Sequence, residues 1–281
     1  MSGSLSANGS AAEVDETGDD AATDGDATPD GDAATADGDA TSNGDTATAA
    51  DDAEHYTFDD VSVVMGTYNE EEAIATVVDD IDEVTGGRAE VVCVDGSSDR
   101  TPEIAREHGA TVIEQEPQGY GVAVREAILA PDRPVVVTTD CDDTYPMEAL
   151  PEFLEAINDA ADVVSGDRLY HGAKAMPAFN RLGNHAFALL ASVLMGERVR
   201  DTTTGMRAYR RDVVEGIEWT ENTGLSAELL IRPLMRGRDV RERPIDYAER
   251  LGETKLDPIE GGAAIAKSIV TVCVEERLRR L

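Results

Sequence analysis

The chain has 281 residues, of which 58 are acidic and 24 basic, and its formal net charge at pH 7 is −34. Such a chain lacks the basic stripe that nucleic-acid binding requires, which excludes that function. Three scattered cysteines also exclude a disulfide framework. A high acid content with only three lysines is typical of proteins that work in concentrated salt, where charge repulsion is screened. We therefore expect a protein of the haloarchaeal cytoplasm.

The first 55 residues differ from the rest, because they hold 15 of the acidic residues and no Lys or Arg. The tetrapeptide Asp-Gly-Asp-Ala recurs there, but without the glycine-rich nonapeptide period of a calcium β-helix. With so few apolar residues, this segment would bury too little surface to offset the conformational entropy that it would lose on folding. We predict a disordered acidic tail at 1–55, a folded domain at 56–258 and a C-terminal amphipathic helix at 259–281.

Up to residue 140, short apolar runs alternate with helical patterns. Strands are expected at 61–66, 89–95, 110–115 and 134–140. The helix after the first strand has one apolar face, formed by Ile74, Val77, Val78 and Ile81. The next helix has Asp99 or Thr101 as its cap, and a third is expected at 120–129. Apolar strands that alternate with helices indicate an α/β fold with a mainly parallel sheet and helices on both faces.

The second half follows a looser pattern. A strand and a loop are expected at 162–170 and a long apolar helix at 177–196, while 240–250 alternates like an exposed strand. We place a donor half at about 56–162 and an acceptor half at about 163–258. The start of the chain lacks the basic and apolar regions of a signal peptide. The apolar stretches are too short to span a membrane.

Polar clusters follow three of the predicted strands. "GTYNEEE" contains Thr67, Tyr68 and Glu70, "VDGSSDRT" contains Asp95, and "TTDCDDTYP" contains Asp140 and Asp142. Ligands bind at the carboxyl ends of strands in such sheets, so these side chains are expected to share one crevice. Acids at a strand end are often only a solvated turn. Two carboxylates two residues apart can instead share Mg²⁺ or Mn²⁺, which would take up charge on a diphosphate leaving group.

Other catalytic motifs are absent from the sequence. "GYGVAV" lacks the third glycine of a dinucleotide fingerprint, and no phosphate-binding loop of the Walker type occurs. There is also no Gly-x-Ser-x-Gly elbow of a serine hydrolase. The second half holds Arg168, Arg181 and Arg207, and Asp201 precedes a run of hydroxyls and a glycine. The arginines either pair with nearby carboxylates or fork onto phosphate oxygens.

The ordered set of motifs resembles family 2 glycosyltransferases, and most of all the dolichyl-phosphate mannose and glucose synthases. The resemblance runs from about residue 61 to 257 and is carried by "TYNEEEAI", "VDGSSDRT", "GYGVAVREAI", "TTDCDDTYP", "GDRLY…NRLGN", "RDTTTGMRAYRRD" and "ERLGETKL". It implies the GT-A fold, a nucleotide-sugar-binding α/β domain with an acceptor half appended. It also implies that Asp140 and Asp142 bind the metal and that Asp95 and Tyr68–Glu70 hold the nucleoside. Arg168 and Arg181 would lie near the donor and lipid phosphates, and Asp201 near the acceptor, as a base or as an orienting group. Lys255 would belong to the element "GETKL", which is similar to a motif late in the family sequence.

The resemblance implies an inverting transfer of a hexose from a UDP- or GDP-sugar to dolichyl or polyprenyl phosphate. The alternatives are transfer to a glycan hydroxyl, for which Asp201 would have to act as a base, and a non-catalytic protein that binds nucleotide-sugar. This chain departs from the family pattern at Val94, where a second acid is usual, and at Thr144, where glutamine is common. With no membrane helix expected, docking on the membrane would fall to 177–195 or the last helix.

Overall fold

The fold is described by a computed structural model that covers residues 55–252 and 258–281. Nearly all of the acidic tail expected at 1–55 lies outside the described residues, and so does Lys255. The described residues fall within a single unit of the chain. The boundary between a donor and an acceptor half near residue 162 therefore stays a prediction.

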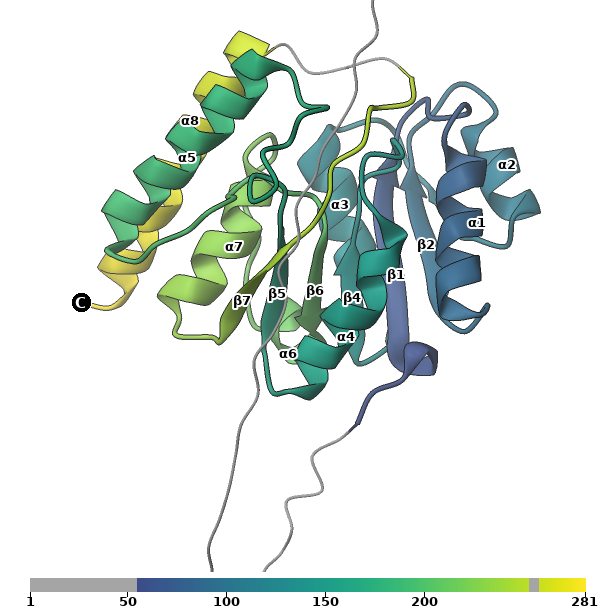
Figure 1. Cartoon of the computed structure of the whole chain (residues 1–281), viewed down its shortest axis with the longest axis horizontal. Helices are drawn as coiled ribbons and strands as arrows, with labels where there is room; N and C mark the ends of the chain where they lie inside the picture. Colours follow the sequence, from purple (N-terminus) through teal and green to yellow (C-terminus); the bar gives the residue numbers. More distant parts are fainter. Residues whose placement is uncertain (1–54, 253–257) are drawn as a thin grey trace, which may run out of the picture. The chain divides into compact units, whose positions relative to one another are not determined.

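Seven strands form one sheet in the order β3-β2-β1-β4-β6-β5-β7 (Figure 1). The strands are β1 (Val61–Thr67), β2 (Glu90–Asp95), β3 (Thr111–Glu114), β4 (Val135–Thr138), β5 (Val163–Asp167), β6 (Arg207–Arg210) and β7 (Val240–Pro244). Only β6 runs antiparallel to its neighbours, β4 and β5. The other pairings are parallel, which confirms the mainly parallel sheet.

Helices cover both faces of this sheet. They are α1 (Ile74–Thr85), α2 (Thr101–Glu107), α3 (Tyr120–Leu129), α4 (Leu150–Asn158), α5 (Ala178–Met195), α6 (Arg211–Glu215), α7 (Leu225–Met235) and α8 (Pro258–Arg279), with single 3₁₀ turns at Phe58–Asp60 and Met147–Ala149. In β1, Val63 and Met65 pack toward α1 and α4, whereas Val64 packs toward α3 and α7. Because both faces are covered, the strand is apolar throughout rather than alternating.

The helical periodicity predicted after the first strand is confirmed in α1. Its four predicted face residues are at most 1% exposed, and Gly86 ends the helix with a φ of 63°. This left-handed conformation suits glycine because it has no Cβ. At the start of α2, Asp99 Oδ1 accepts the backbone N–H of Thr101 at 3.0 Å. The N-cap residue of α2 is nevertheless Arg100, which makes no side-chain capping bond, so neither of the two predicted residues occupies the cap position.

The strand β6 was not predicted. It consists of Arg207, Ala208, Tyr209 and Arg210, and two apolar residues between two arginines do not form a recognisable strand pattern. The strand nevertheless lies in the middle of the sheet, where Ala208 and Tyr209 are fully buried. This position is available to Arg207 because Ser165 Oγ and the Thr202 carbonyl accept hydrogen bonds from its guanidinium at 3.0 Å each.

A further layer of two helices packs on α7. The helices α5 and α8 lie side by side (Figure 1) and share a buried apolar cluster with α7. Buried ion pairs fix α8 in place, since Arg232 of α7 contacts Glu228 at 2.6 Å and Glu276 of α8 at 2.8 Å. Within the described residues, no helix combines the length and the apolar character needed to cross a membrane.

The segment after β7 returns over the carboxyl ends of the strands. The sequence predicted one exposed strand over 240–250, but β7 ends at Pro244 and is half-buried beside β5. Beyond it, Ala248 N–H donates to the Thr144 carbonyl and Leu251 N–H to the Asp142 carbonyl, both at 3.0 Å. These bonds hold residues 248–251 against the acidic loop that follows β4.

Candidate active site

The ends of β1 and β2 are joined by the side chains that the sequence singled out. Thr67 Oγ1 donates to Asp95 Oδ1 at 2.7 Å. Ser97 binds the same carboxylate through its hydroxyl at 2.6 Å and its backbone N–H at 3.0 Å. Asp95 is 2% exposed, while Tyr68 stands at the rim with 46% of its surface exposed. The carboxylate of Asp95 therefore links the ends of the two strands.

The carboxylate of Asp140 lies between Tyr120 and Gly205. Tyr120 Oη, from the start of α3, donates to Asp140 Oδ1 at 2.9 Å. On the other side, a Cβ at Gly205 would lie 2.5 Å from Asp140 Oδ2, so only glycine leaves room for this carboxylate. The run "TTTGM" therefore contributes its glycine to the position of Asp140. Tyr120 is a site residue that sequence reasoning missed, although it directly follows a glycine in "GYG".

Asp142 is buried and is engaged on both oxygens. Its Oδ1 accepts from the Thr144 hydroxyl at 2.6 Å, and its Oδ2 accepts from Arg250 Nη1 at 2.8 Å. Arg250 Nη2 donates in turn to Glu70 Oε1 at 2.9 Å. Arg250 therefore links the β1 end to the acidic loop. Sequence reasoning missed it, because 108 positions separate it from Asp142.

The charges at this site suit a divalent cation. Burial first, and then the nearby Asp142 carboxylate, raise the pKa of Asp140 to about 6. Two carboxylates that oppose each other's ionisation gain from a shared cation, and their oxygens are ligands that Mg²⁺ and Mn²⁺ accept. In the described part of the chain, no group of three or more His, Cys, Asp or Glu is placed to hold a metal. Asp140 and Asp142 would thus leave most of the coordination shell to substrate phosphates and water.

A buried ion pair joins the end of β5 to the segment before β6. Arg168 Nε and Nη2 contact the two oxygens of Asp201 at 2.7 and 2.9 Å, and Asp201 is fully buried. Burial alone would raise the pKa of Asp201, but the Arg168 guanidinium and its hydrogen bonds bring that pKa below its ordinary value. The remaining nitrogen, Arg168 Nη1, reaches Tyr145 Oη at 3.3 Å. Tyr145 Oη also accepts the Gly205 N–H at 2.7 Å, so Tyr145 ties this pair to the Asp140 site.

The other predicted phosphate ligands are placed differently. Arg181 lies half-buried in the first turn of α5, where its Nη1 donates to the Gly172 carbonyl at 3.3 Å. Arg207 is 0% exposed in β6 and holds the strands together, so the structure does not bring it to the crevice. Lys255 lies outside the described residues.

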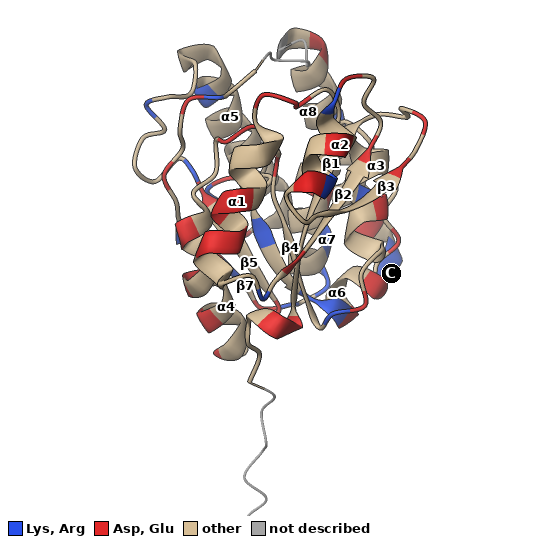
Figure 2. Cartoon of the chain, turned by 90° about the vertical axis from the view of Figure 1, so that its right-hand side faces the viewer, with Lys and Arg blue, Asp and Glu red and all other residues tan. Residues whose placement is uncertain are grey.

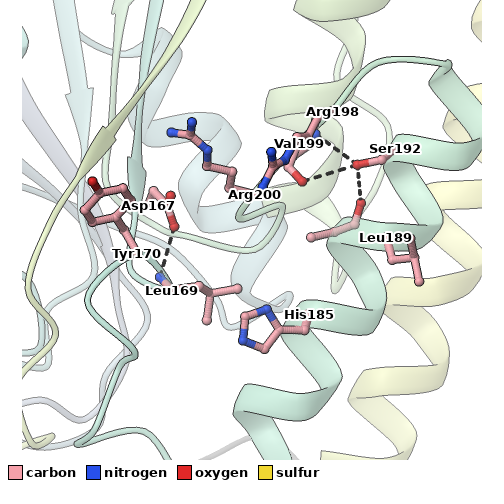
Figure 3. Close-up of a pocket in the computed structure, with 10 residues that line it drawn as sticks. Asp167, Leu169, Tyr170, His185, Leu189, Ser192, Arg198, Val199 and Arg200 are labelled. Atoms are coloured by element: carbon pink, nitrogen blue, oxygen red, sulfur yellow. Dashed lines mark hydrogen bonds between the residues drawn. The ribbon is translucent and has the colours of Figure 1, made fainter.

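A pocket of about 470 Å³ is lined by Asp167, Leu169 and Arg200, which are chain neighbours of Arg168 and Asp201 (Figure 3). The helix α5 contributes Leu189 to its lining, and the segment after α5 contributes Arg198. His185 of α5 also faces it (Figure 3). Neither Arg198 nor Arg200 forms an ion pair with another described residue. The lining thus combines two arginines with one carboxylate, that of Asp167, in an otherwise acidic chain.

Residues 62–217 match the family described as Glycosyl transferase family 2, so the chain belongs to this family and is a glycosyltransferase. The dolichyl-phosphate hexose transferase of Haloferax volcanii is 75% identical to it over 224 residues, a match covering 80% of this chain and 98% of that protein. The dolichol-phosphate mannosyltransferase of Pyrococcus furiosus is 30% identical over 210 residues, which cover 70% of this chain and 59% of that one.

Solved structures support the fold. Glucosyl-3-phosphoglycerate synthase from Mycobacterium tuberculosis, crystallised with Mn²⁺, UDP and glucosyl-3-phosphoglycerate, superposes with a TM-score of 0.59 at 21% identity. The match covers 77% of this chain and 79% of that one. The same enzyme with Mn²⁺, UDP-glucose and glycerol 3-phosphate gives a TM-score of 0.61 at 22% identity. At this identity the likeness establishes the fold, and it confirms the expected GT-A architecture.

Proposed function

We propose that this glycosyltransferase moves a hexose from a nucleotide-sugar to dolichyl phosphate, with inversion at the sugar carbon and with a divalent metal on Asp140 and Asp142. The names of the Haloferax and Pyrococcus relatives support the acceptor. The Mn²⁺ and UDP in the structural neighbours support the metal and the type of donor. The fully buried Arg168–Asp201 pair is the observation that most favours a phosphate acceptor over a hydroxyl.

A hydroxyl acceptor must lose a proton as it attacks, so its enzyme needs a general base. Asp201 is the carboxylate expected near the acceptor, yet it is poorly suited to that role. Both of its oxygens are bonded to Arg168, and its lowered pKa makes it a weaker base than an ordinary aspartate. A phosphate acceptor is already an anion and needs no base. It needs positive charge to approach an anionic donor. We assign this charge to Arg168 and Arg181, together with Arg198 and Arg200 of the neighbouring pocket.

Each part of the crevice then has one task. Asp140 and Asp142 would hold a divalent metal, whose charge would stabilise the negative charge that develops on the departing diphosphate. Thr67 and Asp95 fix the wall against which the nucleoside packs. Asp201 holds Arg168 in one orientation, so that a fixed charge meets the acceptor phosphate and little reorganisation is needed during the reaction. The acceptor attacks the anomeric carbon from the side opposite to the diphosphate, which inverts that carbon.

The pH dependence of turnover tests this division of roles. We expect kcat to be flat from about pH 7 to pH 9, because Asp201 stays ionised throughout and a phosphate monoester loses its second proton near pH 6. The measurement is kcat at saturating donor and acceptor in buffers of constant ionic strength. A limb that rises through this range and is lost in Asp201→Asn would instead show a base at work, and would favour a hydroxyl acceptor.

The acceptor lipid also implies contact with a membrane, and α5 is the best-suited surface. No Asp or Glu occurs between Arg168 and Glu197, although the chain as a whole is strongly acidic. Figure 2 shows acidic residues on α1 and α4, while α5 carries none. One face of α5 exposes four large apolar side chains, namely Phe179, Leu182, Leu189 and Val193, each at least 62% exposed. Such a face fits the interface of a bilayer.

Vesicle binding checks this surface. In molar KCl, which screens repulsion from the acidic body, we expect the protein to sediment with phosphatidylcholine vesicles. Changing Leu189 and Val193 to Glu should lower the bound fraction about 10-fold or more, because charged groups enter the interface poorly. Leu129→Glu is the matched control, since Leu129 is also exposed but lies at the end of α3. Equal binding by all three proteins would rule out α5 as the docking face.

A further inference from the structure

Arg250 pairs with one of the two carboxylates proposed to bind the metal. Its guanidinium bridges Asp142 Oδ2 at 2.8 Å and Glu70 Oε1 at 2.9 Å. Both carboxylates are nearly buried, with side-chain exposures of 6% and 10%. Backbone hydrogen bonds from Ala248 and Leu251 to the acidic loop hold this arginine in register. The contact is therefore a built part of the site and not a chance surface pair.

This arrangement conflicts with binding of a metal alone. Asp142 Oδ1 already accepts from Thr144, and Oδ2 accepts from Arg250. A divalent ion on Asp142 would place two positive groups on one buried carboxylate, and their mutual repulsion would weaken the contact of Arg250 Nη1. The displaced guanidinium would then be a half-buried cation with one partner fewer. It needs a new anion.

Arg250 also has unused donor capacity. Its Nε is buried and makes no hydrogen bond in the described part of the chain. A planar guanidinium with a spare N–H, next to an acidic pair, matches the geometry of phosphate oxygens that a metal brings to that pair. The diphosphate of the donor is the anion that arrives with the metal. Its oxygens can therefore replace Asp142 as the partner of Arg250.

We propose that Arg250 is an internal counter-cation that couples the binding of metal to the binding of nucleotide. Without ligands it forms an ion pair with both Asp142 and Glu70 and offsets part of their negative charge. When metal and nucleoside diphosphate arrive together, the metal takes Asp142 and the diphosphate takes the released guanidinium. Each ligand thus strengthens the binding of the other, and the coupling is reciprocal. This inference rests on the metal site proposed above, and it adds a residue that decides how that site is loaded.

Titration of free Mn²⁺, followed by its electron paramagnetic resonance signal, tests the coupling without any turnover. The full-length protein is titrated alone and with saturating UDP or GDP, each in molar KCl. For the wild type we expect weak binding of Mn²⁺ alone, and an affinity at least about 30-fold higher with the better nucleotide. In Arg250→Gln we expect Mn²⁺ alone to bind about 10-fold more tightly than in the wild type, because a neutral amide no longer competes. The nucleotide should then improve Mn²⁺ affinity less than about 5-fold.

Arg243→Gln is the control, because Arg243 belongs to the same chain segment but pairs with the exposed Glu152 away from the crevice. It should behave like the wild type in every titration, and thermal melts establish that each variant is folded. Mn²⁺ affinities that are equal in wild type and Arg250→Gln, with and without nucleotide, would overturn the role of Arg250 alone. A failure of all three proteins to bind Mn²⁺ under any condition would overturn the metal site itself, and the inference with it.

Discussion

Replacement of Asp140 by asparagine is expected to lower kcat about 1,000-fold while the protein stays folded. The amide keeps the shape of the carboxylate beside Gly205 and can still accept the hydrogen bond from Tyr120. It removes the negative charge that would hold the metal, and losing one such electrostatic element commonly costs two to three orders of magnitude, about 100- to 1,000-fold. The measurement is the initial rate of sugar transfer at saturating metal and donor.

The thermal stability of this variant should be unchanged or higher at pH 8 in metal-free buffer. The pKa of Asp140, about 6, lies above its ordinary value, so the folded state holds the proton more tightly than the unfolded chain. Protonation of Asp140 between about pH 6 and pH 4 therefore stabilises the folded protein, whereas its ionised carboxylate lowers the free energy of unfolding. Asp143→Asn is the matched control, because Asp143 adopts a φ of 59° that asparagine tolerates. Wild-type turnover in Asp140→Asn would contradict the metal assignment.

Replacement of Asp201 by asparagine is expected to destabilise the protein by about 3 to 5 kcal/mol, because it leaves the Arg168 guanidinium buried without a counter-charge. For a domain of this size, the melting temperature should fall by roughly 10 °C. The lowered pKa of Asp201 means that its contribution is present above about pH 3.9 and is lost as the pH falls through the folded value. Thermal melts at pH 7 measure the change.

The double variant Arg168→Met/Asp201→Asn separates charge from packing. Removing the arginine as well removes the uncompensated charge, so much of the lost stability should return. Transfer activity should not return, because the fixed charge that meets the acceptor phosphate is gone. If the single variant melted at the wild-type temperature, the pair would be neither buried nor structural. If the double variant were fully active, Arg168 would have no part in the reaction.

Much of the fold could be predicted because local pattern and tertiary burial agree in the donor half. The face of α1 and the apolar runs of β1, β2 and β4 are buried as their periodicity indicates. The convergence of strand ends was also predictable, since parallel strands point their carboxyl ends the same way. The 2.7 Å bond between Thr67 and Asp95 confirms that the ends of β1 and β2 meet. The roles assigned to these residues in binding substrate stay predictions.

Contacts that only the fold creates were beyond sequence reasoning. Arg250 contacts Asp142 because the segment after β7 returns over the crevice, and no local pattern encodes that path. Arg207 looked like a phosphate ligand, but an antiparallel strand carries it into the sheet interior, where Ser165 Oγ and the Thr202 carbonyl accept hydrogen bonds from two of its nitrogens. Tyr145 follows the acidic motif, yet its bond to Gly205 spans 60 positions.

The most direct test of the central claim is a transfer assay in molar KCl with dolichyl phosphate and Mn²⁺ or Mg²⁺. UDP-glucose and GDP-mannose, each labelled in the sugar, are supplied separately, and label is followed into the lipid phase. The account predicts labelled lipid with one donor, an equal amount of nucleoside diphosphate in the aqueous phase, and loss of both when the metal is chelated. Nucleoside diphosphate without labelled lipid, or neither product from folded protein with either donor, would contradict it.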